Sequence, residues 1–262
     1  MITEFRNEPF TDFASPANQE AIKTALAKVR GEFGKKYPLV INGEYIETND
    51  LLTSTNPAKP KEVVGVSSKA DKALAEKAMS AALTAFESWK HVAPLERARY
   101  LLKAAAIMRA RKSELTAWLI LEIGKSHAEA DGDVAEAIDF LDFYGREMIR
   151  LGGPQPVTPY AGEENELYYI PLGVGLVVPP WNFPLAILVG MTSAAIVAGN
   201  TVLLKPSSET PAIAFQFVKI MEEAGLPPGV LNFVPGPGAS VGDMLVAHPK
   251  TRFIAFTGSK EV

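Results

Sequence analysis

Apolar residues recur at helical spacing through the first half of the chain. The pattern predicts an amphipathic helix over 17–33 and a strand pair over 39–41 and 44–46, with Asn42-Gly43 as the turn. Another strand is expected over 62–67. Long helices then follow over about 71–89, 94–111, 114–123 and 128–150. Their Ala-rich sequences and charged outer faces are typical of helices that pack against a sheet or one another.

The second half changes to short apolar runs that alternate with helical segments. Strands are expected at 173–178, 201–204, 230–234 and 252–256, with helices near 184–198, 209–224 and 240–247. Strand–helix alternation of this kind predicts right-handed crossovers and a mostly parallel sheet. The expected fold class is therefore α/β, a Rossmann-like and mostly parallel sheet with flanking helices.

Unusual residue choices gather where each of these predicted strands ends. The segments are 179–182, 205–208, 235–238 and 257–259. Carboxyl ends of parallel strands share one edge of the sheet, and ligands of such sheets bind at that edge. A binding site is therefore predicted there.

Each segment, considered alone, has two interpretations. The segment 257–259 could rest a phosphate on backbone N–H groups or be an ordinary turn. The glycine-rich stretch 235–242 enters a helix but departs from G-x-G-x-x-G, so it could equally be a tight connection. Lys205 could contact a ribose or phosphate, or be a solvated lysine at a strand end. Asn182 could cap the following helix or donate its amide to a developing oxyanion.

Composition and charge exclude several function classes. A net charge of −4 gives no electrostatic footprint for nucleic acid or an anionic membrane. The longest apolar stretch, 185–198, is too short to span a bilayer, and no secretory signal is visible. A cytoplasmic protein is expected.

No thiolate chemistry or disulfide is encoded, because the chain contains no cysteine. The three histidines lack the spacing of metal ligands, so surface or capping roles are expected and no metal is predicted. The acidic run 129–136 is expected to be a solvated helix face.

Four segments, in order, resemble the aldehyde dehydrogenase superfamily. They are 180–184, 199–207, 225–230 and 256–259, and their order and spacing fit across essentially the whole chain. The segments 5–10, 133–140 and 169–173 further resemble the bacterial branch that oxidises L-glutamate γ-semialdehyde to L-glutamate in proline degradation, with NAD as the oxidant.

The resemblance implies roles for individual positions. Asn182 would donate to the oxyanion, Glu136 would lie near the substrate's amino group, and Phe183 would pack against its aliphatic part. The implied cofactor-binding residues are Pro180, Trp181, Lys205, Ser208, Gly238, Gly242, Phe256, Gly258, Ser259 and Val262. Ser208 stands where many NAD-preferring relatives have a glutamate, which implies some tolerance of NADP.

The resemblance also implies how the chain is organised. Residues 1–153 would form the helical part of the cofactor-binding domain, 154–172 an extended arm of an oligomerisation sheet, and 173–262 an incomplete NAD-binding part. Family members continue into a catalytic domain with a general-base glutamate and a cysteine nucleophile. We therefore expect a truncated chain that is inactive alone and homo-oligomeric when intact. There are two alternatives. The chain could be a non-catalytic dinucleotide-binding or assembly module, or it could belong to the same superfamily with another semialdehyde as substrate.

Overall fold

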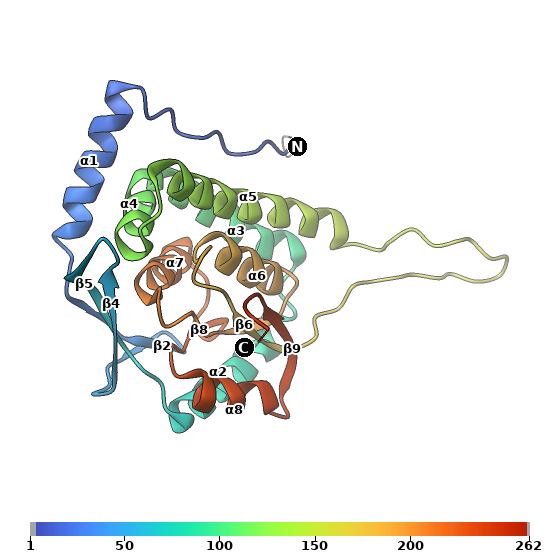
Figure 1. Ribbon diagram of the computed structural model, residues 1–262. Helices are drawn as coiled ribbons and strands as arrows, with labels where there is room; N and C mark the ends of the chain where they lie inside the picture. The colour runs from blue at the N-terminus through green and yellow to red at the C-terminus, as the bar shows by residue number, and fades with distance from the viewer. Residues whose placement is uncertain (1–3, 261–262) are drawn as a thin grey trace.

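Six hydrogen-bonded strands form the centre of the computed structural model, which describes residues 4–260 (Figure 1). Their order across the sheet is β3-β2-β8-β7-β6-β9. The strands are β2 (Leu39–Ile41), β3 (Glu44–Ile46), β6 (Val174–Val178), β7 (Thr201–Leu204), β8 (Leu231–Phe233) and β9 (Thr251–Phe256). Strands β8, β7, β6 and β9 run parallel, whereas β2 is antiparallel to both of its neighbours. The predicted mostly parallel sheet is confirmed.

The hairpin of β2 and β3 forms at the residues that the sequence predicts. Asn42 and Gly43 have φ angles of 53° and 77°, and this left-handed backbone is what a tight two-residue hairpin turn requires. The pairing of Val40 with Phe233 attaches the hairpin to the parallel strands.

A second, three-stranded sheet has the order β1-β5-β4. Its strands are β1 (Lys35–Tyr37), β4 (Leu51–Asn56) and β5 (Lys59–Ser68). Only β5 was predicted. Strand β1 has two exposed lysines and β4 alternates exposed polar with buried positions, so neither shows a continuous apolar run.

Helices cover both faces of the six-stranded sheet (Figure 1). One face carries α3 (Pro94–Ala110), α4 (Lys112–Ile123), α5 (His127–Leu151), α6 (Ala186–Val197) and α7 (Pro211–Ala224), with α1 (Pro16–Arg30) packed on α4. The other carries α2 (Lys72–Trp89), the short π-helix η1 (Gly238–Gly242) and α8 (Asp243–Ala247). Among residues 4–260, no helix is both long and apolar enough to cross a membrane.

Alternate residues of each central strand belong to different cores, as the period of two requires. Val177 and Val202 lie in the core beneath α3 to α7, whereas Leu176 and Leu203 lie in the core beneath α2 and α8. The sheet is therefore buried on both faces, which explains why its strands read as continuous apolar runs.

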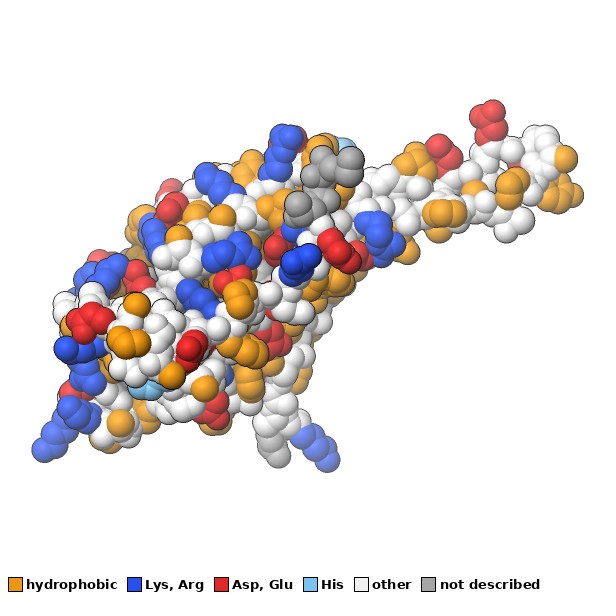
Figure 2. All heavy atoms as spheres, turned by 90° about the horizontal axis from the view of Figure 1, so that it is seen from above, with side chains coloured by type: hydrophobic (Ala, Val, Ile, Leu, Met, Phe, Trp, Pro, Cys, Tyr) orange, Lys and Arg blue, Asp and Glu red, His pale blue; other side chains and the backbone are white. Residues whose placement is uncertain are grey.

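The segment between α5 and β6 leaves the body as a long projection (Figures 1 and 2). Gln155 and Leu167 pair across it as an antiparallel bridge, with the Gln155 N–H 2.8 Å from the Leu167 carbonyl oxygen. Large apolar side chains are exposed along it at Val157, Tyr160, Leu167, Tyr168, Tyr169, Ile170 and Leu172. The projection thus exposes the kind of side chain that is normally covered.

Candidate functional site

The carboxyl ends of neighbouring parallel strands meet at one edge of the sheet, as predicted. The Lys205 N–H donates to the carbonyl of Val177 at 3.0 Å, and the Thr257 N–H donates to the carbonyl of Val178 at 3.3 Å. These bonds bring the segments that follow β6, β7 and β9 side by side.

The helices that connect β6, β7 and β8 lie on one face of the sheet, and those that connect β8 to β9 lie on the opposite face. Helices α6 and α7 pack in the larger core, whereas Val241 of η1 and Leu245 of α8 pack in the core on the opposite face. Such a reversal leaves a crevice outside the strand ends, where doubly wound sheets bind ligands. The segments 180–183 and 257–259 follow β6 and β9, so the candidate site lies there.

Lys205 is buried at this edge. Its residue is 7% exposed, and burial lowers the pKa of its ammonium. Within residues 4–260 no hydrogen bond or ion pair reaches this ammonium. Most of the Lys205 side chain is therefore withdrawn from solvent, which favours contact with a ligand over the interpretation as a freely solvated strand-end lysine.

Two glycines lie at the same edge of the sheet as Lys205. A Cβ added at Gly242 would lie 3.4 Å from Cε of Lys205, so this glycine follows the lysine side chain closely. A Cβ added at Gly238 would meet nothing within 4 Å. The backbone at Gly238 therefore faces open space at the same edge of the sheet.

Asn182 is not a helix cap. Helix α6 begins at Ala186 and its N-cap position is Leu185, so the capping interpretation of Asn182 is wrong. Within the described part of the chain the Asn182 side chain makes no hydrogen bond. It is exposed between Trp181 and Phe183, which are 57% and 40% exposed. Three consecutive side chains are thus presented to the outside.

The N-terminus of α6 is capped from a neighbouring helix by Asp133. Oδ1 of Asp133 accepts a hydrogen bond of 2.6 Å from the Ala186 N–H, and Oδ2 lies 2.7 Å from Nζ of Lys125. Burial raises the pKa of Asp133, while Lys125 and the N–H groups of Ala186 and Leu185 oppose the rise.

The expectation that residues 129–136 form a solvated face is therefore wrong, because Asp131 and Asp133 are both buried. The signal was present in the sequence. Asp133 stands three residues after Ala130 and four before Ala137, on the apolar stripe of α5.

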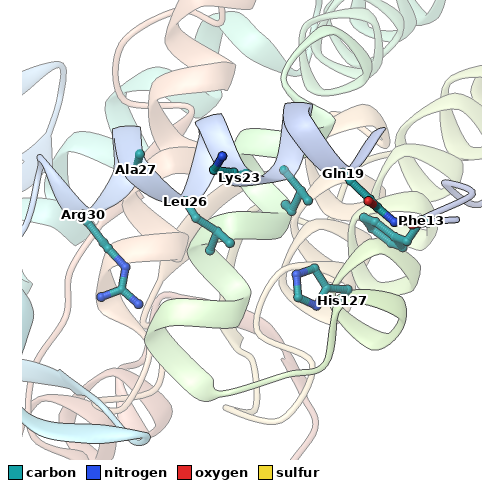
Figure 3. Close-up of a pocket in the computed structure, with 8 residues that line it drawn as sticks. Phe13, Gln19, Lys23, Leu26, Ala27, Arg30 and His127 are labelled. Carbon is teal, nitrogen blue, oxygen red and sulfur yellow. Dashed lines mark hydrogen bonds between the residues drawn. The ribbon is translucent and has the colours of Figure 1, made fainter. Parts of the chain in front are cut away.

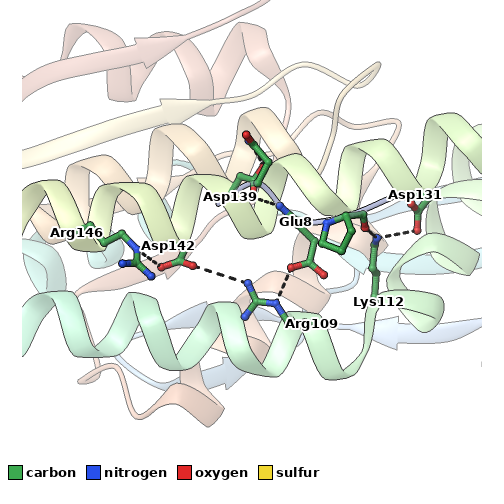
Figure 4. Close-up of polar contacts among 9 residues, drawn as sticks. Glu8, Arg109, Lys112, Asp131, Asp139, Asp142 and Arg146 are labelled. Carbon is green, nitrogen blue, oxygen red and sulfur yellow. Dashed lines mark hydrogen bonds and ion pairs between the residues drawn. The ribbon is translucent and has the colours of Figure 1, made fainter. Parts of the chain in front are cut away.

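The N-terminal segment is bound across the outer side of α5 (Figure 4). Asp131 accepts hydrogen bonds from the N–H and hydroxyl of Thr11 at 2.8 and 2.6 Å, and Asp139 accepts one from the Glu8 N–H at 2.7 Å. Glu8 in turn lies 2.6 Å from Nε of Arg109 on α3. These contacts fix α5, the helix that carries Asp133 and Glu136.

Glu122 caps α7 as Asp133 caps α6. The fully buried carboxylate accepts hydrogen bonds from the N–H groups of Ala212 and Ile213 at 2.9 and 2.8 Å. Burial raises its pKa to about 7, against the opposing effect of these N–H groups. Carboxylates therefore already accept hydrogen bonds from backbone N–H groups at the N-termini of α6 and α7. The segment after β9 is then the candidate for contact with a ligand anion.

Pro180, Ser208 and Ser259 follow strands that end at this edge, whereas Glu136 stands on α5, three residues after Asp133. Glu136 is exposed on α5, but partial desolvation of its carboxyl, followed by the charge of Asp133, raises its pKa. Pro180 is half-buried, and Ser208 and Ser259 are exposed. Within residues 4–260 no hydrogen bond or ion pair joins these polar side chains to another predicted site residue.

The turn after β9 depends on a glycine. Phe256 pairs with Val178 in the sheet and is 43% exposed. A Cβ added at Gly258 would lie 2.7 Å from the Phe256 ring, so a larger residue would displace that ring. Val262 lies outside the described residues.

His91 and His127 are exposed and His248 is the C-cap residue of α8, in agreement with the predicted surface or capping roles. His248 Nδ1 accepts a hydrogen bond from the Lys250 N–H at 3.1 Å, and its Nε2 lies 3.3 Å from Glu76. His127 packs against the Phe13 ring and lines an apolar cavity of about 580 Å³ between α1 and the start of α5 (Figure 3). No predicted site residue lines that cavity, and residues 4–260 contain no cluster of potential metal ligands.

Comparison with known proteins decides the family. A family model described as the aldehyde dehydrogenase family matches residues 45–262. The chain belongs to the aldehyde dehydrogenase family. Within that family it is 55% identical over all 262 residues to a 1-pyrroline-5-carboxylate dehydrogenase of Geobacillus thermodenitrificans, and 56% identical over the same length to one of Bacillus subtilis.

Family members also share the fold of the chain. The solved structure of 1-pyrroline-5-carboxylate dehydrogenase from Thermus with bound NAD is 50% identical, with a TM-score of 0.97 over 99% of this chain. This chain covers 51% of that structure and 51% of each of the two relatives above. The chain thus spans about half the length of the relatives it matches.

Proposed function

We propose that this chain provides the cofactor side of an NAD-dependent dehydrogenase that oxidises L-glutamate γ-semialdehyde, the open form of 1-pyrroline-5-carboxylate, to L-glutamate. Identity of 55% over the whole chain to proteins named for this substrate supports the choice. The observation that carries the proposal is the unpartnered and largely desolvated ammonium of Lys205, a 7% exposed residue beside Gly242.

NAD fits this arrangement. A desolvated ammonium without a partner is unfavourable, and ribose hydroxyl or phosphate oxygens would supply the missing acceptors. Lys205 would hold the adenosine ribose, and the open surface at Gly238 and Gly242 would admit the adenine end.

The other end of the cofactor would lie at the segments after β9 and β6. Ser259 would contact the pyrophosphate, in the turn that Phe256 and Gly258 shape. Pro180 and Trp181 would line the nicotinamide side. Bound NAD supplies the acceptor for the hydride.

Asn182 is the proposed oxyanion donor. Its amide is exposed and free of internal hydrogen bonds within the described residues, so it is available to an aldehyde oxygen that gains negative charge. Because the 262 residues include no cysteine, we propose that they serve the cofactor and the oxyanion and do not turn over aldehyde by themselves.

Substrate recognition is proposed for Glu136 and Phe183. A carboxylate at Glu136 would attract the α-amino group of the semialdehyde, and the exposed ring of Phe183 would cover its methylene groups. An aldehyde without an amino group, such as succinate semialdehyde, would gain nothing from Glu136 and should be a poorer substrate.

Ser208 is proposed to make the cofactor preference incomplete. It is exposed and uncharged, so a 2′-phosphate would meet no carboxylate repulsion at this position. NADP should therefore support measurable turnover, and Ser208→Glu should reduce NADP use more than NAD use. An equal effect on both cofactors would contradict this role.

The test uses the protein expressed from its complete gene. We expect it to reduce NAD with L-glutamate γ-semialdehyde and to have a lower kcat/KM for succinate semialdehyde. The reverse preference would favour another semialdehyde as substrate. NAD binding without reduction of any aldehyde tried would favour a non-catalytic module. The 262-residue chain alone should show no NAD reduction.

We also propose that the complete protein is a homo-oligomer held by the projection at 154–172. The exposed apolar side chains there, including Ile170 at 80% and Tyr160 at 70%, need a cover. The extended backbone around the Gln155–Leu167 bridge could add to a sheet edge of a second copy.

A further inference from the structure

Lys125 and Asp133 form a buried ion pair beneath the segment that carries Asn182. Nζ of Lys125 lies 2.7 Å from Oδ2 of Asp133, and the side chains are 11% and 0% exposed. Desolvation offsets much of the attraction in such a pair, so it is an inefficient means of stabilising a fold. The second contact of each partner is therefore informative.

Each partner also holds one end of the turn between Phe183 and Ala186. Oδ1 of Asp133 accepts the Ala186 N–H at 2.6 Å, at the first residue of α6. Nζ of Lys125 lies 3.8 Å from the centroid of the Phe183 ring, within the range of a cation–π contact. Asn182 immediately precedes that ring.

We propose that Lys125 and Asp133 are positioning residues for Asn182. The pair fixes Phe183 and the start of α6 relative to α5, and so fixes the backbone that presents the Asn182 amide. This inference rests on the proposed role of Asn182 as an oxyanion donor. The Asn182 side chain is exposed and has no hydrogen bond of its own within residues 4–260, so its neighbours must hold it in place. Oxyanion donors act through such preorganisation.

The test is Lys125→Met in the protein expressed from its complete gene. We expect kcat to fall about tenfold or more, because small displacements of a catalytic group have large effects on rate. The KM for NAD should change by less than about twofold, since the pair contacts no proposed cofactor residue. Lys125→Arg keeps the cation and should recover most of kcat. Lys125→Gln gives the same readout if the methionine variant does not fold.

Lys219→Met is the matched control. Lys219 also lies over an aromatic ring, 5.0 Å from the Tyr45 centroid, and its ammonium is 2.6 Å from Glu222. It lies on α7 and contacts no proposed site residue. This variant should leave kcat unchanged, which separates loss of a lysine–aromatic contact in general from loss of this one.

A double-mutant cycle with Asn182→Ala decides whether Lys125 acts through Asn182. If it does, Lys125→Met should lower kcat about tenfold in the parent and less than about twofold in the Asn182→Ala background. Equal losses in both backgrounds would overturn the positioning role while leaving Asn182 as the donor. An Asn182→Ala variant with unchanged kcat would instead overturn the donor role and the positioning role together.

Discussion

The carboxylate of Asp133 and the N–H of Ala186 join helices α5 and α6 through a hydrogen bond of 2.6 Å. Lys125 completes the arrangement on the other carboxylate oxygen at 2.7 Å. Asp133 on α5 thus accepts a hydrogen bond from the first turn of α6, as an N-cap residue of that helix otherwise would. Glu122 does the same for α7, so both crossover helices begin on a carboxylate from a neighbour.

Asp133→Ala should strongly destabilise the fold. The substitution leaves the buried Lys125 ammonium without its carboxylate and leaves the Ala186 N–H without an acceptor, and breaking a buried pair typically costs about 3–5 kcal/mol. Chemical denaturation of the variant and its parent measures the difference in free energy of unfolding. Glu147→Ala, which removes an exposed ion pair with Arg150 on the same helix, should change it little. A similar small change for both variants would contradict the importance of Asp133.

Glu122 should make the stability of the fold depend on pH. Burial raises its folded-state pKa from 4.5 to about 7, so the folded state binds the proton more tightly than the unfolded state. The resulting contribution of Glu122 to the free energy of unfolding is fully present below about pH 4.5 and is lost as the pH rises through about 7. Its full extent is on the order of 3 kcal/mol.

Glu122→Gln isolates this contribution, because every other titrating group remains in both proteins. The glutamine should lower stability at low pH, since its NH₂ group cannot accept the second of the two N–H bonds. The loss of stability between pH 5 and pH 8 should be smaller in the variant than in the parent. Thermal unfolding across this range measures both effects, and parallel pH profiles would rule out Glu122 as the source.

Local sequence pattern predicts much of this fold, since period and turn residues act over short distances. Thr201–Leu204 was predicted with its observed bounds, and Asn42-Gly43 dictates its own turn. The four strand-end segments were also correctly placed on one edge. The strand Lys35–Tyr37 was missed, because its pairing with β5 is a tertiary contact that its own residues do not announce.

The candidate site likewise combines features that local sequence predicts with features that depend on tertiary contacts. Position in the sequence places Lys205 at a strand end, but it does not show that the residue is buried or that Gly242 of η1 lies close to its side chain. That contact joins residues far apart in the chain. Asp133 was missed because the run 129–136 was assigned to a solvated face, and Glu122 was not singled out, although both stand among buried helical positions.

Lys205→Met should have opposite effects on stability and on cofactor binding. Removing an unpaired buried charge should raise the melting temperature, whereas loss of a charged hydrogen-bond donor should weaken NAD binding about tenfold or more. Lys112→Met is the contrast, because Lys112 lies 3.2 Å from buried Asp131 and its loss should lower the melting temperature. Calorimetry and NAD titration test both, and a less stable Lys205→Met with unchanged NAD affinity would contradict the assignment.

Asn182→Ala should lower kcat by about 10²–10³, the usual effect of removing one oxyanion donor. The melting temperature should change little, because the side chain is exposed and free of hydrogen bonds within the described residues. Asn49→Ala, at an exposed amide outside the proposed site and outside the projection, is the control. Steady-state kinetics of the protein from its complete gene gives the result, and a loss of less than about threefold would remove Asn182 from the proposed chemistry.

Ile170→Lys should dissociate the proposed homo-oligomer. Ile170 is 80% exposed on the projection, and a second copy that covers it would have to bury the new ammonium without a partner. Sedimentation of the protein from its complete gene should show a smaller particle for the variant. Leu51→Lys, at a 36% exposed apolar position on β4, should leave the mass unchanged. A monomeric parent, or an Ile170→Lys variant with the parent's mass, would show that the projection does not hold copies together.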